Sequence, residues 1–203
     1  MYSPGRSPMA RNSRRDFLKT VAAGSVAASV FKTGDAVPAQ FPTPAGPADI
    51  AVALTVNGQR HQLRLEPRVT LLEAIRSPIG LTGAKRACDR GSCGACTVMI
   101  DARTYYSCSI LAIEAQGRDI RTVEGLALGP TLHPVQQAIC DHDGVMCGFC
   151  TPGFVVATVA LINGNPTPSP SDAERGLAGN LCRCGAYKGL LAAALDPKAE
   201  RRG

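Results

Sequence analysis

The sequence predicts an α+β fold in which a strand-rich half precedes a helical half. Residues 50–125 contain short β-prone runs separated by turn signals, whereas residues 126–197 space their apolar residues as helices do. Eight of the nine cysteines fall into two groups of four, one group in each half. We therefore expect two small domains, 50–125 and 126–197, each with its own cysteine group.

The first half should form a small sheet with one short helix. Its expected strands are Ile50–Val56, Gln59–Leu65, Thr97–Ile100 and Asp119–Val123. Asn57-Gly58 is a strong hairpin signal between the first two strands. A helix should begin near Thr70 and end before Pro78, because the residue before a proline disfavours helical backbone. Two strands, a helix and further strands in this order fit a β-grasp domain.

The second half should contain four short helices. Pro134 suits the first turn of one helix, and Thr151-Pro152 starts another that ends at Asn163-Gly164. Ser169 and Asp172 have capping-box spacing before a third helix, and the fourth covers about Tyr187–Leu195. Four short helices with short connections predict a small four-helix bundle.

The first cysteine group has the spacing C-x4-C-x2-C, with a fourth cysteine after eleven further residues. Its members are Cys88, Cys93, Cys96 and Cys108. This spacing is typical of a plant-type 2Fe–2S cluster. Gly91 and Gly94 fit, because glycine reaches positive φ and lets backbone N–H groups approach the cluster sulfurs. Zinc and disulfides are the alternatives, although zinc sites more often show two C-x2-C pairs.

The second cysteine group lies at predicted helix ends. Its members are Cys147, Cys150, Cys182 and Cys184. Helix N-termini after Cys150 and near Cys184 would offer N–H donors and partial positive charge to an anionic cluster. By itself the pattern also fits zinc or two disulfides, because an exported protein reaches a compartment that permits disulfides. Next to the first group, we favour a second 2Fe–2S cluster.

The remaining candidate residues are expected to play structural roles. Cys140 lies inside a predicted helix, where a cysteine is usually a small buried hydrophobe rather than a redox switch. His61, His133 and His142 lack partners at metal-ligand spacing, so surface or capping roles are expected. Tyr105 and Tyr106, which precede Cys108, should pack rather than conduct electrons. The cationic pair Lys85-Arg86 is either solvated or complements an anionic cluster or partner.

Positive charge is concentrated at the start of the chain. The formal net charge is +6, and residues 1–39 hold six Lys and Arg against two Asp, which accounts for +4 of it. The rest of the chain has no basic face interleaved with aromatic residues that could follow a phosphate backbone. The charge pattern therefore argues against nucleic-acid binding.

The basic start matches an export leader. Ser13–Lys19 contains the twin-arginine pattern, and the apolar run from Val21 to Phe31 behind it is too short to span a membrane. We expect residues 1–39 to be a twin-arginine signal peptide, residues 40–49 a proline-rich linker and residues 198–203 a short tail. A chain with this leader would be periplasmic.

Four runs together resemble the iron–sulfur subunit of molybdenum hydroxylases, the xanthine oxidase family. They are G-L-T-G-A-K-R-A-C at 80–88, G-S-C-G-A-C-T-V at 91–98, C-G-F-C-T-P-G at 147–153 and G-N-L-C-R-C at 179–184. The leader makes the chain most similar to the small subunit of bacterial periplasmic aldehyde oxidoreductases. Two positions differ from the family pattern: Met146 stands where Gln is usual, and Gly185-Ala186 where Thr-Gly is usual.

The resemblance implies a β-grasp ferredoxin-like domain followed by a helical-bundle domain, each holding one 2Fe–2S cluster. It assigns the first cluster to Cys88, Cys93, Cys96 and Cys108, with Gly94 beside it, and the second to Cys147, Cys150, Cys182 and Cys184. In such enzymes a large subunit carries molybdopterin cytosine dinucleotide and a medium subunit carries FAD. The second cluster then lies next to the pterin and the first lies towards FAD.

These observations predict an electron-transfer subunit without catalytic residues of its own. The parent enzyme would be a periplasmic heterotrimer that oxidises aldehydes to carboxylates, while hydroxylation of N-heterocycles is the alternative within the same family. A free-standing two-cluster ferredoxin and an exported protein built on zinc or disulfides are the rivals from other classes. An obligate subunit should expose apolar patches and co-purify with a large partner.

Overall fold

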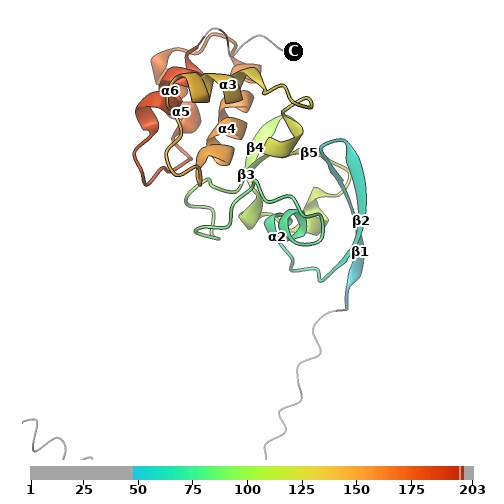
Figure 1. Cartoon of the computed structure of the whole chain (residues 1–203). Coiled ribbons are helices and arrows are strands. Elements are labelled where there is room, and N and C mark those ends of the chain that lie inside the picture. Colours follow the sequence, from blue (N-terminus) through green and yellow to red (C-terminus); the bar gives the residue numbers. More distant parts are fainter. Residues whose placement is uncertain (1–47, 197, 199–203) are drawn as a thin grey trace, which may run out of the picture. The chain divides into compact units, whose positions relative to one another are not determined.

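The computed structural model describes residues 48–196 and 198. The first half of this part of the chain contains a five-stranded mixed sheet (Figure 1). Its strands are β1 (Ile50–Val56), β2 (Gln59–Leu65), β3 (Thr97–Ile100), β4 (Arg103–Tyr106) and β5 (Asp119–Arg121). Their order is β2-β1-β5-β3-β4, with β1 and β5 parallel and the other neighbours antiparallel. The fifth strand ends earlier than predicted, because residues 123–125 form a 3-10 turn.

The predicted hairpin and helix of the first half are confirmed. Asn57 and Gly58 both adopt positive φ in the turn between β1 and β2. Helix α2 (Leu71–Arg76) starts after Thr70, whose hydroxyl accepts from the Glu73 backbone N–H while the Glu73 carboxylate accepts from the Thr70 N–H. The apolar side of α2 packs with the inward side chains of β1 in one buried cluster.

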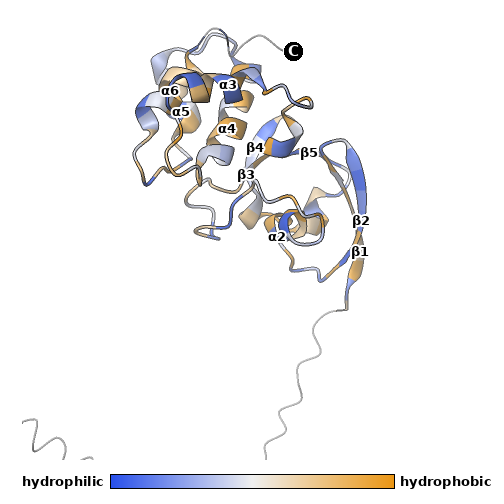
Figure 2. Ribbon diagram, viewed as in Figure 1, coloured by the Kyte–Doolittle hydropathy of each residue, from blue (hydrophilic) through white to orange (hydrophobic). Residues whose placement is uncertain are grey.

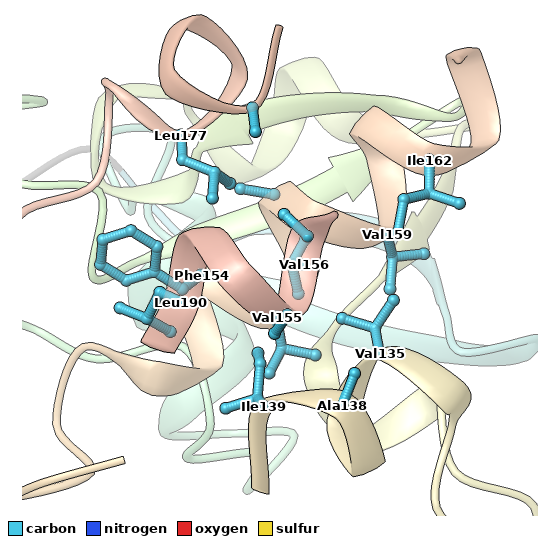
Figure 3. Packing of buried hydrophobic residues seen from close by; sticks show 14 of the residues in the cluster. Val135, Ala138, Ile139, Phe154, Val155, Val156, Val159, Ile162, Leu177 and Leu190 are labelled. Atoms are coloured by element: carbon cyan, nitrogen blue, oxygen red, sulfur yellow. The ribbon is translucent and has the colours of Figure 1, made fainter. Parts of the chain in front are cut away.

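Four helices follow the sheet and share a second core. They are α3 (Pro134–Asp141), α4 (Thr151–Gly164), α5 (Pro170–Leu177) and α6 (Tyr187–Ala194). Helix α4 contacts the other three and is apolar along most of its length (Figure 2). Figure 3 shows Phe154, Val155 and Val159 of this helix among side chains from its neighbours. None of the helices in the described part of the chain combines the length and apolar character that a membrane-spanning helix needs.

The sheet and the helices meet through α4. This helix packs against β3 and β4, which lie beside it in Figure 1. Met99 of β3 is buried in the core that belongs to the helices. The two halves therefore share an apolar boundary. The predicted leader (1–39), nearly all of the linker (40–49) and nearly all of the tail (198–203) lie outside the described residues.

The expectation that Cys140 is buried is wrong. Helix α3 includes the residue as predicted, but its side chain is exposed. Val135 and Ile139 face the core, and each residue along a helix turns the side-chain direction by about 100°, which carries Cys140 to solvent. The capping prediction for His133 is confirmed, because its Nδ1 accepts from the Val135 N–H at 3.2 Å. The His142 ring lies 2.9 Å from the Asp196 carboxylate.

Candidate metal centres

The first cysteine group lies where the chain runs from α2 into the β3–β4 hairpin. Cys88, Cys93 and Cys96 belong to the loop before β3, and Cys108 lies in a 3-10 turn directly after β4. The Ser107 N–H and hydroxyl both donate to the Cys96 carbonyl, at 3.3 and 2.7 Å. The spacing of eleven residues is thus explained, because the hairpin brings Cys108 back beside Cys96.

Backbone N–H groups point at the sulfurs of this loop. Gly91 donates to Cys108 Sγ at 3.2 Å and Ser92 donates to Cys88 Sγ at 3.3 Å. The turn needs a φ of 71° at Gly91, which glycine adopts without steric cost. The Arg90 N–H lowers the pKa of Cys88 to about 7, whereas burial raises the pKa of Cys96 to about 12. Metal binding must therefore release at least the proton of the buried thiol.

Helix α2 holds the segment that leads into the first cysteine group. Arg76 Nη1 donates to the carbonyls of Thr82 and Ala84, at 2.9 and 2.7 Å. Arg86 donates to the Glu73 carboxylate at 2.8 Å, so the cationic residue two positions before Cys88 is paired within the chain. These contacts fix the loop from outside, which leaves its backbone amides free to face the sulfurs.

The second cysteine group comes from two segments that lie far apart in the sequence. Cys147 and Cys150 immediately precede α4, and Cys182 and Cys184 lie between α5 and α6. The thiols meet in pairs, Cys147 beside Cys184 and Cys150 beside Cys182. The packing of α4 and α5 therefore assembles this group, as the two helix-end positions predicted.

The second group also receives backbone donors. The Ala186 N–H lies 3.4 Å from Cys182 Sγ, and the Cys182 N–H donates to the Tyr187 hydroxyl at 2.8 Å. The Phe149 N–H lowers the pKa of Cys147, and burial raises the pKa of Cys150 to about 12. Each group thus combines a thiol of lowered pKa with a thiol whose pKa is raised by desolvation.

One cavity connects the two groups. Its volume is about 390 Å³, and Cys93 of the first group lines it together with Cys147, Cys150 and Cys182 of the second. The rest of the lining includes the apolar side chains of Phe149 and Leu181, together with Arg183 and Tyr187. The structure therefore brings together two sites that are well separated in the sequence.

The thiol arrangement fits a two-iron cluster in each group. All nine cysteines lie within the described residues and none forms a disulfide. Within residues 48–196 and 198, no three His, Cys, Asp or Glu side chains gather as ligands of a single metal ion. In a 2Fe–2S cluster each iron takes two thiolates, and both groups present their thiols in adjacent pairs: Cys88 with Cys93 and Cys96 with Cys108 in the first. The N–H donors would stabilise the anionic cluster.

Comparison with protein families defines the class. A family described as "2Fe-2S iron-sulfur cluster binding domain" matches residues 54–127, and one described as "[2Fe-2S] binding domain" matches residues 122–195. The chain is therefore a protein with two 2Fe–2S domains, one in the sheet region and one in the helical region.

Individual relatives identify the family. The aldehyde oxidoreductase iron-sulfur-binding subunit PaoA of Escherichia coli O157:H7 is 38% identical over 92% of this chain and 88% of its own length. The nicotine 6-hydroxylase small subunit of Paenarthrobacter nicotinovorans is 40% identical over 76% of this chain and 93% of its own. A solved structure of quinoline 2-oxidoreductase from Pseudomonas putida 86 superposes with a TM-score of 0.73 at 38% identity, covering 75% of this chain and 94% of that chain. The chain belongs to the iron–sulfur subunits of the molybdenum hydroxylase family.

Sequence reasoning missed the residues that join the two sites. The Tyr106 hydroxyl donates to the Gly179 carbonyl at 2.8 Å, and the Asn180 amide donates to the Gly94 carbonyl at 2.9 Å. Both contacts link residues far apart in the chain, so no local periodicity indicates them. The only signal was the position of Gly179 and Asn180 within the G-N-L-C-R-C run.

Proposed function

We propose that this chain is the electron-relay subunit of a periplasmic aldehyde oxidoreductase. Its partners would be a large subunit carrying molybdopterin cytosine dinucleotide and a medium subunit carrying FAD, which together make a heterotrimer. The observation that supports this most strongly is the meeting of the two cysteine groups around one cavity, because a relay needs two neighbouring redox sites. The sheet and helical regions would be the β-grasp domain and the four-helix bundle expected from the sequence.

The contribution of this chain is to hold and insulate redox centres. When bound, 2Fe–2S clusters supply one-electron carriers. The cysteine thiolates would hold them, and the N–H groups of Gly91, Ser92 and Ala186 would stabilise their negative charge. Acid–base chemistry on substrate would belong to the large subunit.

The second cysteine group would face the molybdenum-bearing partner, and the first would lie towards FAD. Cys147 and Cys184 are exposed, whereas Cys96 and Cys108 are buried. Exposed apolar side chains lie close in sequence to the exposed pair: Met146 is 64% exposed, Leu181 55% and Phe149 47%, and the exposed Arg183 stands beside them. An apolar patch of this kind marks a protein–protein contact more often than free surface.

Aldehydes are the substrates that we propose for the assembled enzyme. The alignment with PaoA covers 92% of this chain, whereas the two iron–sulfur domains span only residues 54–195. Since only eight residues of the given sequence follow residue 195, an alignment that covers 92% of it must also include many residues before 54. The relative acting on nicotine and the similar structure of quinoline 2-oxidoreductase keep N-heterocycle hydroxylation as the second candidate.

Export by the twin-arginine route is the second part of the proposal. The Ser13–Lys19 pattern ahead of a short apolar run supports it. Changing both Arg14 and Arg15 to Lys should leave assembled, cluster-containing protein in the cytoplasm. If the double variant reached the periplasm in normal amounts, the export proposal would be refuted and the relay proposal would be unaffected.

Purification of the native protein tests the relay proposal. We expect a complex that contains molybdenum, FAD and ~4 iron atoms per copy of this chain, the last because each cluster has two irons. Activity on aldehydes and on N-heterocycles, measured side by side, decides between the two substrate classes. A chain that purifies alone with its iron would instead be a free ferredoxin, and stoichiometric zinc would contradict both readings.

A further inference from the structure

Three consecutive residues of the helical region bind to the sheet region at the first cysteine loop. The Gly179 carbonyl accepts from the Tyr106 hydroxyl at 2.8 Å. The Asn180 side-chain amide donates to the Gly94 carbonyl, and the Leu181 N–H donates to the Cys93 carbonyl at 2.9 Å. We call these contacts the junction. It lies directly before Cys182, so it joins the chain segments that carry the two cysteine groups.

Among the described residues, Asn180 is the only buried side chain that donates two hydrogen bonds across the junction. Its side chain is 5% exposed, and Nδ2 lies 2.9 Å from the Gly94 carbonyl and 3.2 Å from Thr97 Oγ1. Thr97 in turn donates its hydroxyl to the same Gly94 carbonyl at 2.6 Å. The amide thus completes a closed set of hydrogen bonds among groups that are almost fully buried.

The junction is packed backbone to backbone. A Cβ at Gly94 would meet the Gly179 carbonyl at 2.5 Å and Asn180 Nδ2 at 2.7 Å, and a Cβ at Gly153 of α4 would overlap the Gly94 carbonyl. No side chain other than that of Asn180 enters this contact from the 179–181 segment, since Gly179 has none and Leu181 is exposed. A small change in the Asn180 side chain must therefore shift backbone on one side or the other.

The junction contains a short connection between ligand positions of the two groups. From Cys93 the path runs through its own carbonyl and one hydrogen bond to the Leu181 N–H, and the next residue is Cys182. Electron transfer weakens steeply when such a connection lengthens or when a hydrogen bond in it is replaced by a gap. The rate of transfer along this path therefore depends on the distance between the Leu181 N–H and the Cys93 carbonyl.

We propose that Asn180 is a positioning residue that sets the spacing between the two cysteine groups and so the electronic coupling across the Cys93–Leu181 hydrogen bond. The inference rests on the proposed two-cluster function. Asn180 would touch neither cluster; it acts by holding Gly94 and Thr97 against the 179–181 segment. Its loss would leave both clusters in place but weaken the exchange of electrons between them.

The test compares three variants in the assembled complex. Asn180→Asp keeps the side-chain shape but loses the amide donors, and Asn180→Leu removes polarity at similar size. Asn163→Asp is the control, because it adds the same charge at an exposed position of α4. Iron and sulfide content is measured first, then the EPR splitting caused by magnetic interaction of the two reduced clusters, then the rate of cluster-to-cluster transfer after rapid mixing with substrate.

We expect both Asn180 variants to keep wild-type iron while the EPR splitting shrinks and transfer between the clusters slows on the order of tenfold, as small misplacements of reacting groups do. The control should match wild type in all three measurements. Unchanged splitting and transfer in a fully loaded Asn180→Leu protein would overturn the inference. Loss of one cluster from Asn180→Asp would also overturn it, because the residue would then serve assembly. Wild-type protein without two clusters would refute the proposed function instead.

Should both Asn180 variants fail to fold, Thr97→Val decides. This change removes the hydroxyl that accepts from Asn180 and donates to Gly94, but leaves the amide of Asn180 in place. An EPR splitting below that of wild type, with full iron content, supports the inference. Wild-type splitting in this variant contradicts it.

Discussion

The two cysteine groups are built in opposite ways. The first lies within one stretch of chain, 88–108, and a single hairpin closes it. The second joins 147–150 to 182–184 and exists only when α4 and α5 are packed. The first has its later two cysteines buried, whereas the second leaves Cys147 and Cys184 exposed. A local loop can thus shield a redox centre, while a site assembled from distant segments can be presented at the surface for a partner.

The largest effects are expected from variants that remove one cysteine from either group. Cys184→Ser should lower iron from ~4 to ~2 atoms per chain and leave the first cluster intact, since its ligands lie in another region. In the assembled enzyme, substrate should still reduce molybdenum, while reduction of the first cluster and of FAD becomes far slower. Iron analysis and rapid-mixing spectroscopy measure these effects.

Cys93→Ser is the matched variant for the other group. It should leave the second cluster rapidly reducible by substrate, with electrons stalled before the acceptor. Fast reduction of the first cluster in the Cys184→Ser enzyme would place that cluster beside molybdenum and reverse the proposed orientation.

Two glycines of α4 give the next largest contrast. Gly153→Ala should destabilise the protein by about 2 kcal/mol, because its Cβ would overlap the Gly94 carbonyl in the junction. At the other end of the helix, the Cβ added by Gly164→Ala would meet no atom of the described residues within 4 Å, so this change should stabilise the protein by about 0.5 kcal/mol. Denaturant unfolding of the two variants checks the signs. Equal effects would mean that the junction is loosely packed.

The same substitution at two buried threonines should have opposite effects. Thr97→Val removes a hydroxyl that makes hydrogen bonds with Gly94 and Asn180, and should cost about 1 kcal/mol. Thr158 of α4 is 1% exposed, and its hydroxyl has no hydrogen-bond partner among the described residues. Thr158→Val should therefore be neutral or stabilising by up to about 1 kcal/mol. Thermal unfolding distinguishes them; destabilisation by Thr158→Val would reveal a bond that the structure lacks.

The smallest expected effect is at Cys140. Because the side chain is exposed and belongs to neither group, Cys140→Ala should change the free energy of unfolding by less than about 0.5 kcal/mol and keep the full iron content. Iron analysis with thermal unfolding measures both. A lost cluster would show that the ligand assignment is wrong.

Local patterns predicted the elements well, because their causes are local. The Asn57-Gly58 turn, the Thr70 and Ser169 caps and the apolar spacing in α4 all act within a few residues. The exposure of Cys140 was missed, because inclusion in a helix does not say which side faces the core. The cysteine spacings predicted two groups of four, and the structure brings the thiols of each group together in pairs. The role of these cysteines as cluster ligands stays a prediction.

The junction could not be predicted in the same way. Asn180 meets Gly94 and Thr97 only after the helices have packed on the sheet. A polar residue two positions before a cysteine is expected to be solvated until that packing is known. Arg76 likewise holds Thr82 and Ala84 through bonds that neither hydropathy nor spacing encodes.

The parallel pairing of β1 with β5 bears on the order in which the chain folds during synthesis. Strand β1 ends at Val56, but its inner neighbour begins only at Asp119, after the whole first cysteine group has been made. Until then β1 is an edge strand, and pairings of such long sequence separation form slowly. The Gln116 side chain, which accepts from the Ala53 N–H at 3.0 Å, arrives with the same late segment. The segment 88–108 with the first cysteine group is therefore fully synthesised before β5 can pair with β1 and complete the sheet.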